Sequence, residues 1–447
     1  MPSSRSAITA LITAPITAAA ACLMLAVPVT AAAPSTPDLP KAVAYLVDPG
    51  NLQGGRYYES FPGFPDFGLT IDGAFALAAT GGDDARLRAV TEFIAAGGVV
   101  ADGGFSVGDW LGLGTPYAAG GSIGKVALLA EVTGNDPRAF GGNDLIAALH
   151  DVTCTTADAA AGCDAPGNYL WATSVFSQSL GILAQARAGA DSSAAVAYLL
   201  GLQRADGAFP SLIPAAAAGD PGDEDVDSTA LAAMALAAAG GHAAAVDAAL
   251  AWIAGRQGDG GWFPGAAGHS TNSTGLAVQA LSLSPAYAQR VSSGLAFLAA
   301  RQNADGGFPV ADTGESASDV RASTQVVAGA TGVSLGTLVR DVHTVPASPS
   351  PSPSVSPSPV ASVSASASVS ASASGSASAS GSASASGSAR ASGSARASVS
   401  PSGSSPSGSG HLPTTGFPLT GVLVAAAALI VAGLLLLLLV RRRDPRP

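Results

Sequence analysis

The chain has 447 residues, of which 48% are hydrophobic and 11% are charged, and its formal net charge at pH 7 is −11. This acidic balance argues against nucleic acid and against an anionic membrane surface as partners. The two ends of the chain differ in composition from a long middle part, which has enough residues to bury one large core.

The first 33 residues have the pattern of a secretory signal peptide. Arg5 supplies a short basic start, residues 8–29 are mostly apolar, and Thr30 is followed by three alanines that suit cleavage. We therefore expect export, with cleavage after about Ala33. Cys22 leaves a lipoprotein signal as an alternative, although the residues around it fit that pattern poorly.

Residues 34–345 form the predicted body of the secreted protein. Its two cysteines, Cys154 and Cys163, lie in a short stretch of small and polar residues. Outside the cytosol, such a nearby pair is most simply a disulfide. A metal site or a reactive thiol is the alternative, but no histidine cluster accompanies the pair.

A glycine-rich turn motif recurs in the body. Its three full copies begin at Gln203, Gln257 and Gln302, and each contains Asp-Gly shortly before Phe or Trp. An Ala- and Leu-rich stretch precedes each copy, and a stretch that starts with Ser and Thr follows it. Glycine allows positive φ in the turn, and Ser or Thr suits the first position of a helix. The repeating unit is therefore predicted to be helix, turn, helix.

Extending this period toward the N-terminus gives six units and twelve helices. The first helices of the units are predicted at residues 41–46, 86–96, 143–152, 194–202, 243–256 and 291–301. The second helices are predicted at residues 70–80, 122–132 and 173–187 and after residues 227, 272 and 322. The predicted fold class is all-α.

The recurring Gln-x-x-Asp-Gly-Gly-Trp/Phe pattern resembles the repeat motif of squalene cyclases. It thereby resembles the α/α-toroid superfamily, which includes terpene cyclases, prenyltransferase β subunits and transcobalamin-type vitamin binders. The resemblance covers residues 40–336. It implies an α/α toroid of six helical hairpins that binds its ligand near the starts of the inner helices. An open helical solenoid is the alternative.

The resemblance implies a ligand pocket at those helix starts. The candidate pocket residues are Asp72, Asn168, Tyr169, Trp171, Gln178, Asn272 and Arg321. Helix N-termini there would favour anionic groups of a ligand.

The segment Asp225-Val226-Asp227-Ser228 resembles the Asp-x-Asp-Asp motif with which type II terpene cyclases protonate an alkene. Asp227 takes the place of the acid, but Ser228 replaces the last Asp and would support it less well. Asp225 and Asp227 are therefore only candidate catalytic residues. Capping of a repeat helix is the alternative role for Asp227.

The sequence predicts neither a metal site nor a cofactor, because its histidines fall at no ligand spacing. Segments around Asp72 and Gln178 resemble inner helices of the transcobalamin-type binders, which leaves corrinoid binding as an alternative. A polysaccharide lyase is a weaker one, because the body contains few Lys and Arg residues.

Residues 346–411 are rich in Ser, Ala, Pro and Gly. This composition lacks the apolar side chains needed for a core, so we expect a disordered linker that acts as a stalk.

A second sorting pattern, at residues 412–447, ends the chain. It consists of a pentapeptide, an apolar run at residues 417–440 and three arginines. The run is long enough to span a bilayer as a helix, and basic residues after it stay in the cytoplasm. The pentapeptide residues are Leu412, Pro413, Thr414, Thr415 and Gly416.

This order resembles the LPXTG sorting signal of Gram-positive surface proteins. The resemblance implies that sortase cuts between Thr415 and Gly416 and joins Thr415 to peptidoglycan. The expected partners are then sortase, peptidoglycan and, before sorting, the plasma membrane. The expected location is the cell wall, with covalent attachment.

We therefore expect a cell-wall-anchored surface protein whose toroid binds a small molecule, a glycan or a protein in its central cavity. No nucleophile with a base and no intact Asp-x-Asp-Asp motif can be assembled from the sequence. The alternative is a secreted enzyme of the terpene-cyclase or polysaccharide-lyase type with Asp227 as its acid.

Overall fold

A computed structural model describes residues 35–343, except residues 102, 103, 218, 221, 267 and 315. The predicted signal peptide, stalk and sorting signal, including the membrane-spanning run, lie outside the described residues. None of the described helices is both long and apolar enough to cross a bilayer.

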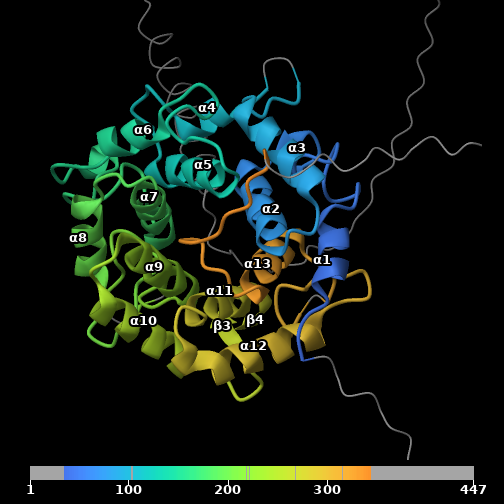
Figure 1. Ribbon diagram of the computed structural model, residues 1–447. Coiled ribbons are helices and arrows are strands. Elements are labelled where there is room, and N and C mark those ends of the chain that lie inside the picture. Colours follow the sequence, from blue (N-terminus) through green and yellow to red (C-terminus); the bar gives the residue numbers. More distant parts are fainter. Residues whose placement is uncertain are drawn as a thin grey trace, which may run out of the picture.

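Thirteen α-helices, two short 3-10 helices and four short strands make up the regular structure of the described residues. Twelve of these helices form two concentric layers around one axis (Figure 1). The inner helices are α2 (Phe67–Thr80), α5 (Gly120–Val132), α7 (Val175–Arg187), α9 (Val226–Ala239), α11 (Thr271–Leu281) and α13 (Val320–Ala330). The outer helices are α1 (Leu39–Leu46), α3 (Asp84–Ala95), α6 (Leu145–Asp151), α8 (Ser193–Leu202), α10 (Ala243–Gly255) and α12 (Ala288–Arg301).

The inner layer is a closed ring. Each inner helix packs against the next, and α13 packs against α2 to complete the circle (Figure 1). Gln302 also joins the two ends of the body: its side chain accepts a hydrogen bond from the Asp38 amide and donates one to the Asp38 carbonyl, at 2.8 and 2.9 Å. The predicted all-α toroid of six hairpins is confirmed, and the open solenoid is excluded.

The inner helices are buried on nearly every side, as expected for helices that are apolar all round. Small residues let their backbones approach closely. A Cβ at Gly124 of α5 would lie 2.6 Å from the amide nitrogen of Gly181 on α7. A Cβ at Gly329 of α13 would overlap the carbonyl of Gly275 on α11. These contacts require glycine, so they fix how tightly the ring closes.

The repeated turn fastens each hairpin to the next. The glutamine that opens each copy donates from Nε2 to the carbonyl of the glycine four residues later. The same amide group donates to a carbonyl at the start of the next outer helix. These second acceptors are Ala245 for Gln203, Arg290 for Gln257 and Asp38 for Gln302.

The Ser and Thr residues after each turn have a different role from the predicted one. The N-caps lie earlier in the chain, at Asp225 for α9, Ser270 for α11 and Asp319 for α13. The later hydroxyls accept hydrogen bonds from the backbone N–H of the turn's aromatic residue. These pairs are Phe209 with Thr229, Phe263 with Thr274 and Phe308 with Ser323. These hydrogen bonds connect the turn to the inner helix. The predicted cap positions were therefore wrong by a few residues, since the residues before them cap the helices.

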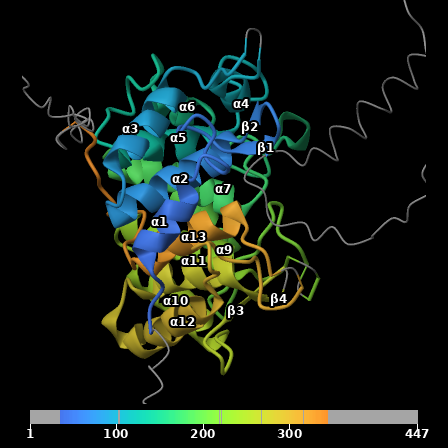
Figure 2. The same cartoon turned by 90° about the vertical axis from the view of Figure 1, so that its right-hand side faces the viewer.

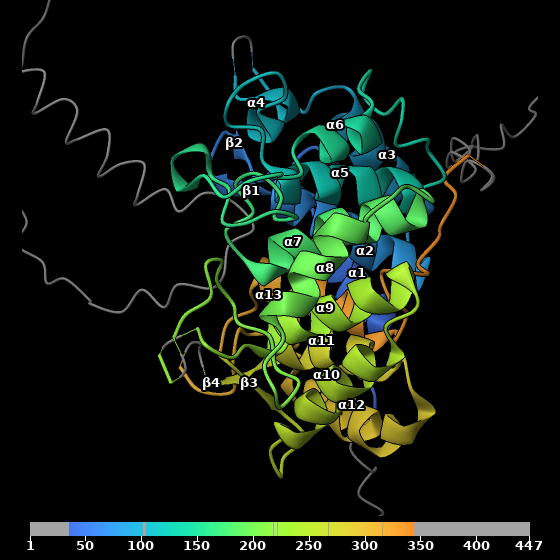
Figure 3. The same ribbon diagram turned by 90° about the vertical axis from the view of Figure 1, so that its left-hand side faces the viewer.

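The remaining elements lie mainly in the loops that lead from an outer to an inner helix. The hairpin β1 (Glu59–Phe61) with β2 (Phe64–Pro65) precedes α2, and the hairpin β3 (Phe263–Gly265) with β4 (Gly268–Ser270) precedes α11. Helix α4 (Val107–Leu111) precedes α5. Figures 2 and 3 show both hairpins at one end of the ring.

The predicted disulfide is present in the loop before α7. Cys154 and Cys163 are bonded, with their Cα atoms 5.8 Å apart. The bond closes a small loop that contains a short 3-10 helix (Ala159–Ala161).

The last described residues, 331–343, cross the opposite end of the ring, and we call them the C-terminal strap (Figures 1 and 3). Arg187 of α7 donates to the strap carbonyls of Leu335 and Leu338, at 2.9 Å each. Arg340 of the strap pairs with both carboxylate oxygens of Asp84, at 2.7 and 2.6 Å. The strap therefore covers the C-terminal ends of the inner helices.

Candidate functional site

The N-terminal turns of the six inner helices meet at the end of the ring opposite the strap, and we call this end the mouth. All six inner helices run in the same direction, because an outer helix returns the chain between them. Their positive dipole ends therefore converge on the mouth. Residues that the sequence spreads over more than 250 positions come together there.

Two ion pairs bridge neighbouring helices at the mouth. Asp72 of α2 forms an ion pair with Lys125 of α5, with 2.7 Å between Oδ1 and Nζ. Asp66, the N-cap of α2, forms an ion pair with Arg321 of α13, with 2.7 Å between Oδ2 and Nη2. The Lys125 side chain is only 1% exposed, whereas those of Asp72 and Arg321 are 13% and 24% exposed. The candidates Asp72 and Arg321 thus reach solvent, and each is held in place by an opposite charge.

The charges of these pairs act on one another. Burial raises the pKa of the Asp66 carboxyl, but Arg321, the hydrogen bond from the Leu69 amide and Lys125 together hold it below its usual value. Asp66 is therefore ionised at neutral pH. The mouth contains fixed charges of both signs, which is an environment for a polar ligand.

Asp227 lies in the first turn of α9 and is buried. Burial, and next the nearby Asp225 carboxylate, raise the pKa of Asp227 to about 8, against the opposing effect of the Ser273 hydroxyl on α11. Its Oδ1 has no hydrogen-bond partner among the described residues. Burial and Asp225 thus favour the protonated form of Asp227 at neutral pH, and its Oδ1 is a buried oxygen without a partner among the described residues.

The alternative role of Asp227 as a helix cap is wrong. The N-cap of α9 is Asp225, whose Oδ2 accepts a hydrogen bond from the Ser228 amide at 2.8 Å. Asn272, at the same position of α11, also does not cap its helix, and its Oδ1 accepts from the Ser270 hydroxyl at 2.7 Å. Asp227 and Asn272 thus occupy equivalent positions. The Oδ1 of Asn272 has a hydrogen-bond partner within its own helix start, whereas the Oδ1 of Asp227 has none among the described residues.

Three other candidates are used inside the fold. Gln178 is fully buried, accepts from the Tyr169 amide and from Asn168, and donates to the Gly167 carbonyl. The Tyr169 ring is also fully buried, and its hydroxyl donates to Gln185 at 2.5 Å. These side chains brace the loop before α7, so the expectation that Asn168, Tyr169 and Gln178 reach a ligand is corrected.

Trp171 lies on the surface beside the mouth. Its indole Nε1 donates to the Pro116 carbonyl at 2.8 Å, and its ring packs 6.0 Å from that of Tyr117. Its φ of 56° is the only positive value among the described residues other than glycine. Trp171 was predicted to line the ligand pocket; the structure places it half-buried in the loop before α7, packed against Gly162 and Tyr117.

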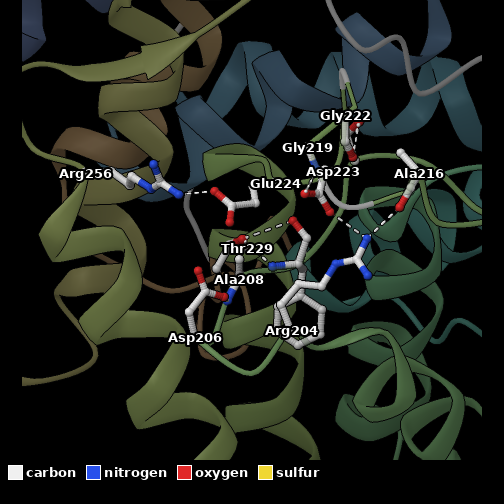
Figure 4. Close-up of polar contacts among 12 residues, drawn as sticks. Arg204, Asp206, Ala208, Ala216, Gly219, Gly222, Asp223, Glu224, Thr229 and Arg256 are labelled. Atoms are coloured by element: carbon white, nitrogen blue, oxygen red, sulfur yellow. Dashed lines mark hydrogen bonds and ion pairs between the residues drawn. The ribbon is translucent and has the colours of Figure 1, made fainter.

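The loop before α9 is held by two arginines from neighbouring turns (Figure 4). Arg204 pairs with Asp223 at 2.6 Å and donates to the Ala216 carbonyl, and Arg256 pairs with Glu224. These contacts position Asp225 and therefore the first turn of α9. Asp223 and Glu224 of this loop are paired with arginines, so we assign these residues a role in holding the loop and not in binding a ligand.

Sequence reasoning missed several residues of the mouth. Lys125 is one of two lysines in the chain, and this rarity within an apolar helix was the available signal. Gln325 of α13 is partly exposed, and its Oε1 has no hydrogen-bond partner among the described residues. Ser273, in the first turn of α11, interacts through its side chain with Asp227 of α9. No sequence pattern pairs residues of different repeats, so these contacts required the fold.

Two hollows on the surface lie at α3, with volumes of about 670 and 410 Å³. Neither is lined by a candidate residue. Within the described part of the chain, no three His, Cys, Asp or Glu side chains are grouped so that they could hold a metal ion.

The helical ring defines the class of fold, an α/α toroid. Solved structures with some likeness to the chain include a protein from Actinoplanes, with 21% identity over 66% of this chain and 98% of the other, and a TM-score of 0.47. The type II terpene cyclase MstE from Scytonema has 15% identity over 66% and 96%, with a TM-score of 0.46. The ent-copalyl diphosphate synthase from Streptomyces platensis has 18% identity over 60% and 50%, with a TM-score of 0.39. No protein-family model and no curated protein matches the sequence.

Proposed function

We propose that this protein displays its toroid on the cell wall and binds a polar ligand at the mouth of the ring. The observation that carries the proposal is the set of polar groups that separate helices bring to the mouth. Asp72, Lys125 and Arg321 supply fixed charges, and Asp227 and Gln325 each supply an unpartnered oxygen. A buried polar atom without a partner costs free energy, and a ligand that bonds to it recovers that cost.

The chemistry of these groups narrows the ligand. A protonated Asp227 donates a hydrogen bond, and the Gln325 amide both donates and accepts. The ion pairs at the mouth are already neutralised, so a ligand needs no large net charge of its own. Hydroxyl, amide and carbonyl groups fit this arrangement, whereas a bare hydrocarbon would leave the charges desolvated.

Wall attachment is the second half of the proposal, and it rests on the sequence. The sorting pattern at residues 412–447 and the stalk before it suit a domain that works outside the cell. A ligand from the cell wall would reach the ring at its mouth.

The ligand proposal is tested by thermal shift of the full secreted protein. The panel contains wall glycans, corrinoids and terpenoids, because a ligand that binds the native state must raise the melting temperature. We expect a polar compound to raise it in the wild type, and the shift to fall in Gln325→Leu. Val339→Ser, in the strap at the other end of the ring, is the matched control. Absence of any shift across the panel would contradict the proposal.

A second candidate function is acid catalysis by Asp227. The specific observation is that this carboxyl is buried beside a second carboxylate, with its pKa raised to about 8. Such a group is protonated at pH 7 and so can deliver a proton, as a general acid must. Ser228 stands where a further carboxylate would support it, which limits the strength of the acid.

Turnover separates the two candidates. An enzyme would convert a terpenoid or glycan, and Asp227→Asn would abolish this conversion while leaving binding within a few fold. A binding protein would release every bound compound unchanged, in the wild type and in Asp227→Asn alike.

A further inference from the structure

Exposed apolar side chains gather around the mouth. Six large hydrophobic residues are exposed in the described part of the chain, and five of them lie in loops that lead from an outer to an inner helix. These five are Phe61, Val99, Phe105, Tyr117 and Leu212. Only Val339 lies elsewhere, in the strap. Unexplained apolar surface on one face indicates an interaction site.

Three neighbouring loops join part of this surface into one strip. We call the exposed Tyr117 and Leu212, with the half-buried Trp171 between their loops, the rim strip; they precede α5, α7 and α9. The loop of Tyr117 is bonded to that of Trp171 through the indole Nε1 and the Pro116 carbonyl, 2.8 Å apart. The loop of Leu212 is bonded to that of Trp171 through the Ile213 amide and the Thr173 carbonyl, 3.0 Å apart. The three loops are therefore adjacent to one another.

The strip is also held rigid. The Trp171 amide donates to the Gly162 carbonyl at 2.9 Å, which ties the residue to the loop closed by the Cys154–Cys163 disulfide. Trp171 keeps a positive φ of 56°, which is unfavourable for a bulky side chain unless the surroundings enforce it. Tyr117 is 64% exposed, so its ring is free to receive a partner.

The charges around the strip select the kind of partner. The three loops, residues 96–119, 152–174 and 203–225, contain a single basic residue, Arg204, and many Asp and Glu. Arg204 is already paired with Asp223 at 2.6 Å. Anionic polymers and anionic membranes would therefore be repelled. Carboxylates accept hydrogen bonds from hydroxyl groups, which a neutral sugar offers in number.

We propose that the rim strip is a binding site for a neutral polysaccharide. The C–H face of a sugar ring packs on the exposed Tyr117 ring, which Trp171 supports, and the hydroxyl edge of the sugar meets the surrounding acidic residues. The sorting pattern at residues 412–447 favours this occupant, because the wall in which it would place the domain is itself a glycan layer. The proposal is independent of any ligand in the mouth.

The test is a depletion assay with the full secreted protein and insoluble neutral glycans. The probes are chitin, cellulose and cell-wall sacculi stripped of anionic polymers. We expect at least one glycan to remove the protein from solution, and Tyr117→Ala to weaken this binding about tenfold, since an aromatic face and its buried area are lost. Tyr117→Phe should retain most of it. Val339→Ser, equally exposed at the strap end, should bind like the wild type.

Two further arms separate the alternatives. Phosphatidylcholine vesicles and polylysine test a lipid surface and a cationic peptide. Binding to either of them with no binding to any glycan would overturn the proposal, as would glycan binding that Tyr117→Ala leaves unchanged. Gln325→Leu should bind glycan normally, which separates this site from the mouth.

Discussion

The sequence motif identified Asp227, but only the fold explains why the pKa of its carboxyl is raised. The motif identified it as a possible acid, but its burial, the Asp225 carboxylate and the Ser273 hydroxyl come from three-dimensional packing. For Asn168, Tyr169 and Gln178 the resemblance predicted a pocket, and the structure uses the same side chains to support a loop. Sequence similarity located the helix starts well, but it did not reveal the direction of individual side chains.

The raised pKa of Asp227 has a consequence for stability. In the unfolded chain the carboxyl ionises near pH 4, whereas in the folded protein it stays protonated until about pH 8. The unfolded state therefore binds fewer protons between these values, and the free energy of unfolding falls as the pH rises through this range.

We expect Asp227→Asn to remove this dependence. The variant should match the wild type near pH 4 and exceed it at pH 8 by on the order of 3 kcal/mol. Urea unfolding of both proteins from pH 4 to pH 9 measures the difference. Parallel stability curves for the two proteins would show that Asp227 is ionised in the fold.

At the scale of elements, the helices could be predicted because their cause is local. The outer helices α8, α10 and α12 end where a copy of the glycine-rich turn begins, and the observed α8 and α10 lie within two residues of the predicted bounds. The strap could not be predicted, since residues 331–343 have neither a repeat nor a helical period. Their structure comes from Arg187, Asp84 and other groups far away in the chain.

The contact between α11 and α13 predicts the effect of one methyl group. Gly329→Ala would place a Cβ against the Gly275 backbone, which cannot move without opening the ring. We expect a loss of stability of about 2 kcal/mol. Gly201→Ala in α8 is the matched control, because nothing lies within 4 Å of its added Cβ, and it should stabilise the protein by about 0.5 kcal/mol. Thermal unfolding compares the two, and equal effects would contradict the close packing.

Arg187 and Arg340 both hold the strap, and we expect their replacement to change the stability of the protein by different amounts. Arg187 lies 3.3 Å from the buried Glu131, whose pKa burial raises to about 7 against the effect of Arg187. Arg187→Ala strands this carboxyl and frees two strap carbonyls, so we expect a loss of about 3 kcal/mol.

Arg340→Ala removes a more exposed pair and should cost about 1 kcal/mol. The double variant Arg187→Ala with Glu131→Gln should recover part of the loss, because it removes the stranded charge. Chemical denaturation checks all three proteins. A milder effect at Arg187 than at Arg340 would show that the buried pair does not hold the strap.

At the scale of the whole molecule, the two ends of the described ring differ, because the strap crosses one end and the first turns of the inner helices lie at the other. Gln302 joins the first helix to the last turn, and the strap seals the C-terminal ends of the inner helices. The last described residue, His343, belongs to the strap at that end. A wall tether attached there would leave the mouth and the rim strip facing away from the attachment point.

Wall attachment gives its own prediction. Mass spectrometry of enzymatically digested walls should recover peptides that end at Thr415 and carry a wall fragment. Thr415→Ala with Leu412→Ala should shift the protein to the membrane fraction, whereas a change in the stalk should not. Intact residues 416–447 in most of the mature protein would contradict sortase processing.

The central claim is that a ligand binds at the mouth, and hydrogen–deuterium exchange tests it most directly. The full secreted protein is compared with and without the compound that gives the largest thermal shift. We predict slower exchange in peptides that contain the first two turns of α2, α5, α9 and α13, with no change in the strap. Slower exchange confined to the strap or to the outer helices, or no change at all, would contradict the account.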